Sequence, residues 1–201
     1  YERILEYLQL LMDEDELAKG IHHLIKALGG FYSTNYKLVS ENVGKAADIF
    51  KKLKVYDLHG TTHMIWGTNL RSLGELDAAV EHLIISTEDI DEKGVFSIYK
   101  GYGFYQLGEI YVNIKDYKSA ENNYLLAVNN AEISGKQTPL FRAYNGLGNL
   151  FLAKNSKKKA FEYLQKSLDI ALEPSQTSRA LCDLGIYYSS INENIKGKRT
   201  L

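Results

Sequence analysis

The chain has few of the residues that cross-link or stiffen a small fold. Its 201 residues include one cysteine, Cys182, and two prolines. A single cysteine excludes a disulfide within the chain, and so few prolines favour long helices over a fold built from many turns. Because the sequence indicates no histidine or acidic partner for Cys182, it predicts a structural cysteine rather than a catalytic nucleophile.

Two further absences limit the partners. The sequence contains no run of about 18 apolar residues, so it predicts no transmembrane helix and no membrane insertion. The formal net charge of −1 provides no overall field that would attract nucleic acid or an anionic membrane. We therefore expect a cytoplasmic protein without a nucleic-acid partner, and a signal peptide removed upstream of Tyr1 is the open alternative.

What the chain does contain is one short sequence motif in five copies, which we call the phrase. In each copy, a large apolar residue and a glycine precede another large apolar residue. The glycines of successive copies lie 38, 41, 40 and 37 residues apart. A period of about 40 residues is typical of stacked structural units, which present an extended binding surface rather than a catalytic pocket. The copies are Leu28-Gly29-x-x-Tyr32, Trp66-Gly67-x-x-Leu70, Leu107-Gly108-x-x-Tyr111, Leu147-Gly148-x-x-Phe151 and Leu184-Gly185-x-x-Tyr188.

Around the third copy, apolar residues follow the helical spacing twice. Leu107 and Tyr111 lie on one face of a predicted helix, and the pattern resumes at Ala120 and Tyr124 after a polar interruption. This pattern predicts two amphipathic helices joined by a short turn, a helical hairpin. Gly108 and Ala120 are small, so we expect the two backbones to approach closely there while the large rings fill the space beside them.

The phrases divide the chain into five units after an N-terminal segment. Between Gly29 and Ala46 lie 17 positions, against 12 between Gly108 and Ala120, so the first unit is expected to have a longer connection around residues 33–35. The fifth unit lacks a clear second helix, and we expect the native protein to continue. The predicted segments are 1–19 (N-terminal helix and linker), 20–58 (irregular repeat 1), 59–92 (repeat 2), 93–136 (repeat 3), 137–173 (repeat 4) and 174–201 (incomplete repeat 5).

The third unit carries a resemblance to a known family. Its residues Phe104, Leu107, Gly108, Tyr111, Tyr117, Ala120, Tyr124 and Ala127 match the consensus of the tetratricopeptide repeat. The family's common period is about 34 residues, and the longer period here resembles the repeats of kinesin light chains and of bacterial signalling proteins. The resemblance implies an all-α fold, a right-handed α-solenoid of antiparallel helical hairpins.

In that family, the first helix of each hairpin lines a concave groove. Carried over to this sequence, the resemblance implies that polar and aromatic side chains of these helices bind an extended peptide. Arginine offers a planar fork of donors, asparagine both a donor and an acceptor, and tyrosine a stacking face and a hydroxyl. The alternative is that they are ordinary solvated helix positions. The groove residues are Arg71, Tyr102, Tyr105, Glu109, Arg142, Asn145, Asn149 and Arg179.

Metal chemistry is the main competing interpretation of single residues. His59 and His63 lie four residues apart and could share one helix face with metal-ligand spacing. His63, however, occupies the packing-aromatic position of its repeat, so the sequence favours a packing role. No metal and no cofactor are expected.

The sequence therefore predicts a non-enzymatic scaffold that binds a protein or peptide segment and is a fragment of a larger protein. The alternative is a sensory or regulatory module of a bacterial signalling protein, such as a histidine kinase, a diguanylate cyclase or a peptide-responsive transcription regulator. A metal-dependent enzyme is a third hypothesis. The open ends of a repeat array would also allow copies of the chain to associate into a homo-oligomer.

Overall fold

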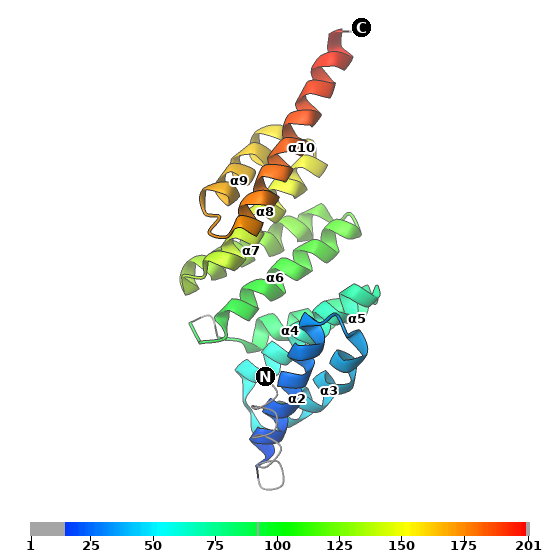
Figure 1. Cartoon of the computed structure of the whole chain (residues 1–201), viewed down its shortest axis with the longest axis vertical. Coiled ribbons are helices and arrows are strands. Elements are labelled where there is room, and N and C mark those ends of the chain that lie inside the picture. Colours follow the sequence, from blue (N-terminus) through cyan, green and yellow to red (C-terminus); the bar gives the residue numbers. More distant parts are fainter. Residues whose placement is uncertain (1–14, 92, 200–201) are drawn as a thin grey trace. The chain divides into compact units, whose positions relative to one another are not determined.

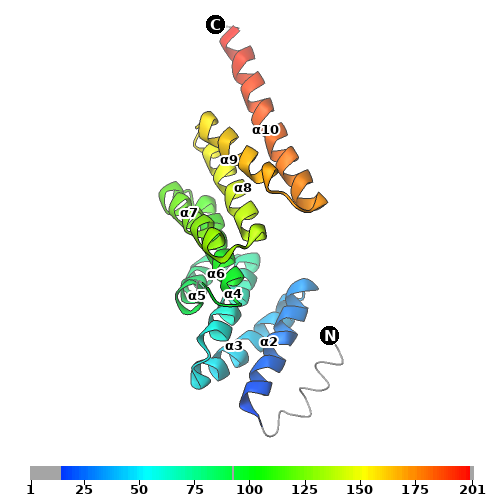
Figure 2. The same ribbon diagram turned by 90° about the vertical axis from the view of Figure 1, so that its left-hand side faces the viewer.

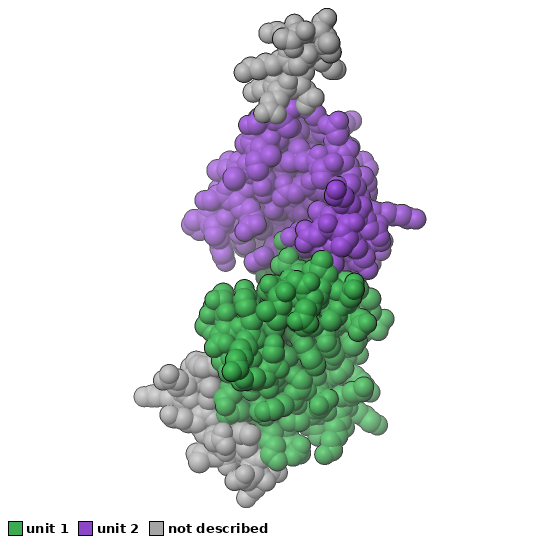
Figure 3. Space-filling view, turned by 90° about the vertical axis from the view of Figure 1, so that its right-hand side faces the viewer, with its two compact units in different colours: residues 1–106 green, residues 107–201 purple. Residues whose placement is uncertain are grey.

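The computed structural model describes residues 15–91 and 93–199, with side chains up to residue 191. The regular secondary structure in these ranges is α-helical, which confirms the predicted all-α fold (Figure 1). The chain forms two compact units, residues 1–106 and residues 107–201 (Figure 3), and the boundary falls within α6. The helices are α2 (Glu16–Tyr32), α3 (Tyr36–Leu53), α4 (Tyr56–Leu73), α5 (Leu76–Asp89), α6 (Ser97–Asn113), α7 (Tyr117–Ser134), α8 (Gln137–Ala153), α9 (Lys157–Asp169) and α10 (Pro174–Arg199).

Within each unit, consecutive helices pack as hairpins. In unit 1, α2 lies against α3 and α4 against α5, and in unit 2, α8 lies against α9 (Figure 2). Each hairpin also contacts the next one within its unit, because α3 packs against α4 and α7 packs against α8. This succession of contacts is that of an α-solenoid. The right-handed winding of the whole array stays a prediction.

Every hairpin turn contains one residue with a left-handed backbone. These residues are Thr34, Gly74, Lys115 and Asn155, with φ between 54° and 85°. A left-handed conformation costs a residue other than glycine roughly 1–2 kcal/mol, so three of the four turns carry backbone strain. The four turn residues recur at intervals of 40, 41 and 40 residues, and they provide a marker of the repeat that does not depend on glycine.

The turn residues correct the register of the first repeat. Seven residues before them lie Ala27, Gly67, Gly108 and Gly148. The small residue of the first repeat is therefore Ala27, which is 0% exposed, and not Gly29 of the predicted phrase. Alanine is small enough for this position, so a search for glycine selected the wrong residue.

The prediction of a longer connection in the first repeat was wrong for the same reason. Residues 33–35 join α2 and α3, and this turn is as short as those of the later hairpins. The prediction compared Gly29 with Ala46. The equivalent pair is Ala27 and Val39, which lie twelve residues apart like the pairs of the other repeats and are both 0% exposed.

The boundaries predicted at residues 20 and 59 fall inside helices. Helix α2 begins at Glu16, where the side chain of Asp15 caps the helix by accepting a hydrogen bond from a backbone N–H. Helix α4 begins at Tyr56. Residues 1–14, which make up most of the predicted N-terminal helix and linker, lie outside the described residues.

The ring of Tyr124 holds three helices of unit 2 together. Tyr124 is 1% exposed, and its hydroxyl donates a hydrogen bond to Glu109 Oε1 on α6 at 2.5 Å. A Cβ added to Gly108 on α6 would lie 2.5 Å from Tyr124 Cε1, and one added to Gly146 on α8 would lie 2.6 Å from the same atom. The ring thus occupies the space that two missing side chains leave, and α7 packs closely against both neighbours.

Replacement of Gly108 by alanine tests this close approach. The added Cβ would overlap the Tyr124 ring, and the ring cannot move aside because Gly146 approaches it from α8. We expect Gly108→Ala to lower the free energy of unfolding by about 1–3 kcal/mol, the usual cost of overpacking a core. Urea unfolding followed by circular dichroism measures the change.

The matched control is Gly185→Ala, at the same phrase position in α10. Apart from the backbone of α10 itself, no atom of the described residues lies within 4 Å of a Cβ added there. Because alanine favours a helix over glycine by about 1 kcal/mol, the control should keep or raise the stability of the chain. Equal destabilisation by the two substitutions would show that the glycines are not close-contact positions.

Candidate functional site

The residues predicted to line a groove belong to both compact units. Arg71, Tyr102 and Tyr105 lie in unit 1, and the other five lie in unit 2. Each group therefore has to be considered within its own unit.

The residues in unit 1 contribute to packing as much as to the surface. Tyr102 is half-buried and packs against the core that Leu24, Val43 and Ile65 help to form. Arg71 is half-buried in the last turn of α4, and its Nε has no hydrogen-bond partner among the described residues. Tyr105 is half-buried as well.

In unit 2, the structure brings two of the predicted residues together through a third that was not predicted. Asn145 Nδ2 donates a hydrogen bond of 2.7 Å to Asp183 Oδ2, and Asn149 Nδ2 donates one of 3.3 Å to the same oxygen. Asn145 and Asn149 lie one turn apart on α8, and Asp183 lies on α10. We call these three residues the amide–carboxylate cluster.

The cluster is partly open to solvent. Asn145 is only 6% exposed, whereas Asn149 is exposed and Asp183 is half-buried. The buried amide therefore depends on Asp183 for a partner, and the exposed amide keeps hydrogen-bonding capacity for another molecule. Asp183 was not among the predicted groove residues.

Arg142 and Arg179 occupy equivalent positions beside the cluster. Each lies five residues after the first residue of its helix, Gln137 in α8 and Pro174 in α10, and each is exposed. On its helix, Arg142 lies one turn before Asn145, and Arg179 lies one turn before Asp183. The two arginines thus add positive charge next to the amide–carboxylate cluster.

Glu109 makes a packing contact that was not predicted. Its carboxylate accepts the hydrogen bond of the Tyr124 hydroxyl, which places it at the junction of α6 and α7. The contact serves the packing of the ring, and the sequence pattern of a single helix contains no sign of it.

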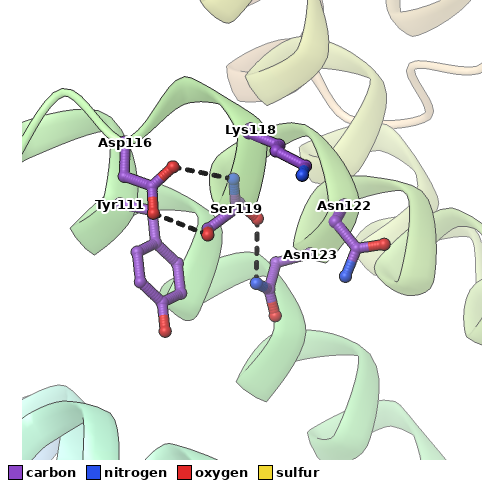
Figure 4. A pocket seen from close by; sticks show the side chains of 6 residues that line it. All are labelled: Tyr111, Asp116, Lys118, Ser119, Asn122 and Asn123. Carbon is purple, nitrogen blue, oxygen red and sulfur yellow. Dashed lines mark hydrogen bonds between the residues drawn. The ribbon is translucent and has the colours of Figure 1, made fainter.

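A polar pocket of about 450 Å³ lies at the turn between α6 and α7 (Figure 4). Ser119 donates to Asp116 through both its backbone N–H and its hydroxyl, and the amide of Asn123 donates to the Ser119 carbonyl. The hydrogen bonds from Ser119 lower the pKa of Asp116. Asp116 is the N-cap of α7, so these bonds close the start of a helix.

Two properties of the described residues concern metal-binding clusters and helices that could span a membrane. Among these residues, no group of three or more histidine, cysteine, aspartate and glutamate side chains could hold a metal ion. No described helix is both long enough and apolar enough to span a bilayer.

Comparison with known proteins identifies the repeats. Residues 102–173 match the family model described as tetratricopeptide repeat. These residues are tetratricopeptide repeats. The match covers α7, α8 and α9 and most of α6, so the resemblance predicted from the sequence is confirmed. The tetratricopeptide hairpins therefore contain Tyr124, Arg142, Asn145 and Asn149.

A solved structure extends the similarity in fold to nearly the whole chain. The crystal structure of BtubC (BKLC) from P. vanneervenii matches with a TM-score of 0.79 at 18% sequence identity. The match covers 98% of this chain and 84% of that one. At this identity, the likeness shows a shared fold. No curated protein matches the sequence.

Removal of the Asp183 carboxylate tests the amide–carboxylate cluster. Asp183→Ala leaves the buried Asn145 amide without its acceptor, and such a loss costs roughly 1–3 kcal/mol. We expect the free energy of unfolding to fall by that amount in urea titrations. Asn149→Ala is the control: it removes only the longer, exposed bond, and its effect should stay within about 0.5 kcal/mol. A neutral Asp183→Ala would mean that the buried amide has another acceptor.

Proposed function

We propose that the chain is a non-enzymatic protein-binding module, and that α8 and α10 of unit 2 hold an extended acidic segment of the partner. Tetratricopeptide repeats generally mediate protein–protein interaction and are generally non-catalytic scaffolds. This general role supports a binding module here, while the binding surface and the chemistry of the partner have to be argued from the side chains.

The amide–carboxylate cluster is the observation that carries the proposal. It links the first helix of the α8–α9 hairpin to the helix that follows this hairpin, because Asn145 and Asn149 on α8 both donate to Asp183 on α10. The exposed Asn149 has a second N–H and a carbonyl oxygen to offer. A side-chain amide with a free donor and a free acceptor can pair with the backbone of an extended segment.

The two arginines indicate which charge to expect on the partner. Arg142 and Arg179 are exposed at equivalent positions of α8 and α10, one helical turn before the cluster. A guanidinium fork binds a carboxylate through two parallel hydrogen bonds. We therefore expect an aspartate or glutamate side chain of the bound segment at these arginines, and backbone contacts at Asn149.

Selection from a display library of short unstructured peptides tests the proposal. The selected peptides should be enriched in aspartate and glutamate, and their affinity should fall at high salt. Arg142→Ala should weaken binding about 10- to 100-fold, because a hydrogen bond to a charged group contributes roughly 1.5–3 kcal/mol and each 1.4 kcal/mol is about tenfold in affinity. Fluorescence anisotropy of a labelled peptide measures the affinity.

Two control variants make the result specific. Arg142→Lys keeps the charge and loses the planar fork, so its affinity should lie between those of the unmodified chain and Arg142→Ala. Lys158→Ala removes an exposed cation from α9, the second helix of the same hairpin, and should leave binding unchanged. Peptides without acidic enrichment, or equal losses in Lys158→Ala and Arg142→Ala, would count against this surface.

A further inference from the structure

Three of the chain's five histidines form a line across the α4–α5 hairpin of unit 1. His59 Nδ1 lies 2.5 Å from Asp89 Oδ2. His59 Nε2 lies 3.1 Å from His63 Nε2, and His63 Nδ1 lies 2.8 Å from His82 Nδ1. His59 and His63 belong to α4, and His82 and Asp89 belong to α5. We call these four residues the histidine chain.

The contacts assign the protons of the histidine chain. A neutral imidazole has one N–H donor and one acceptor nitrogen, and an ionised carboxylate only accepts. His59 Nδ1 therefore donates to Asp89, and His59 Nε2 accepts from His63. His63 Nδ1 in turn accepts from His82. All three rings are then neutral, and the outer Nε2 of His82 is the one acceptor nitrogen left over.

This arrangement has room for one additional proton. The proton binds to the outer Nε2 of His82, and the charge can pass to the next ring by a shift of the shared protons, without movement of any ring. A second charged ring would place two N–H groups opposite each other at the 2.8 Å contact or at the 3.1 Å contact. That contact would break.

The hairpin leaves little space for a ring to move away. His63 is 6% exposed, and α4 has a glycine on either side of it. A Cβ added to Gly60 would lie 2.7 Å from Ile90, and one added to Gly67 would lie 2.7 Å from Leu83. Because α4 and α5 are this close at both places, the loss of the His63–His82 contact requires the two helices to separate. The loss of the His59–His63 contact requires one of two rings on α4 to turn in this closely packed space.

We propose that the histidine chain is a proton-binding site with a capacity of one proton, which makes the α4–α5 hairpin an acid-sensitive element of unit 1. In its neutral form, the histidine chain ties α4 to α5 through two hydrogen bonds, His59 to Asp89 and His63 to His82. The third hydrogen bond, between His59 and His63, lies within α4 and connects these two. The first proton taken up in acid is held within the chain. Uptake of the second proton breaks one of the two ring-to-ring contacts and thereby destabilises the folded hairpin.

The surroundings of the rings also oppose the uptake of protons by the histidine chain. Burial lowers the pKa of His63 to about 3, and the neighbouring rings and Lys51 on α3 add to this effect. Burial also lowers the pKa of His82, against the opposing field of Glu81 on α5. The charged side chains whose fields act on His63 and His82 are thus Lys51 and Glu81, and Asp89 bonds to His59.

The sign of the pH dependence follows from the protons bound in each state. In the unfolded chain, the three histidines titrate independently near pH 6.5 and bind three protons in acid, whereas the folded hairpin binds one. Stability is therefore present above about pH 6.5 and is lost as the pH falls toward about 3, where His63 takes up its proton in the folded state. Because the unfolded chain binds two more protons in acid than the folded hairpin, the folding equilibrium constant falls about 100-fold for each unit by which the pH is lowered.

Urea unfolding of the whole chain from about pH 7 to about pH 5 tests the proposal, because most carboxylates stay ionised in this range. His63→Leu interrupts the histidine chain and lets His59 and His82 each bind a proton. Most of the 100-fold change in the folding equilibrium constant per pH unit should therefore disappear. His23→Leu is the control: its ring lies 2.9 Å from Asn42 on α3, away from the chain, and the variant should keep the original dependence. Equal pH dependence in the unmodified chain and His63→Leu overturns the proposal.

A second measurement on the unmodified chain covers the case in which His63→Leu does not fold. Trp66, the single tryptophan, stacks on His82 with ring centroids 4.1 Å apart. Its fluorescence should change when the stacked ring gains a proton, at a higher pH than the loss of helical circular dichroism. Nitrogen-15 spectra near neutral pH should show N–H groups at Nδ1 of His59 and His82 and at Nε2 of His63. Another set of tautomers, or coincident fluorescence and dichroism transitions, overturns the proposal.

Discussion

The close approach of helices at residues without a large side chain is the constraint on which both units depend. In unit 2, the ring of Tyr124 fills the space left by Gly108 and Gly146, so one side chain joins α6, α7 and α8. In unit 1, Leu83 approaches Gly67 in the same way. A helix crossing this tight fixes the relative position of the side chains around it. The spacing of the helices therefore determines which polar side chains meet in each unit, and the proposed functions depend on these contacts.

The same packing produces two different kinds of polar contact. In unit 2, the amide–carboxylate cluster lies between α8 and α10 and is partly open, so Asn149 keeps a donor and an acceptor for a partner. In unit 1, the histidine chain lies inside a hairpin, and His63 is almost completely covered. An open cluster can exchange its water for a ligand, whereas a covered one can gain little more than a proton. Burial therefore separates a binding role from an acid-sensitive one.

Much of the fold could be predicted from single positions, because tight helix crossings leave a strong mark in a sequence. Gly67, Gly108 and Gly148 each lie within contact distance of the second helix of their own hairpin, as their shared phrase indicated. The first repeat could not be aligned by that phrase, since Ala27 takes the place of the glycine. Of the predicted site residues, Asn145 and Asn149 meet at one carboxylate, but no pattern within α10 singled out Asp183 as their partner.

The sequence by itself determined that the chain is a series of helical hairpins, since the period of its small and apolar residues directly records which faces are buried. It also indicated the helix faces on which Arg142, Asn145 and Asn149 lie. Only the tertiary structure decided which side chains meet. A helix period gives the direction of a side chain around its own axis, whereas a contact between helices depends on where the two axes cross. The Tyr124 hydroxyl on Glu109, the Asp183 carboxylate between two amides and the line of three histidines all arise at such crossings.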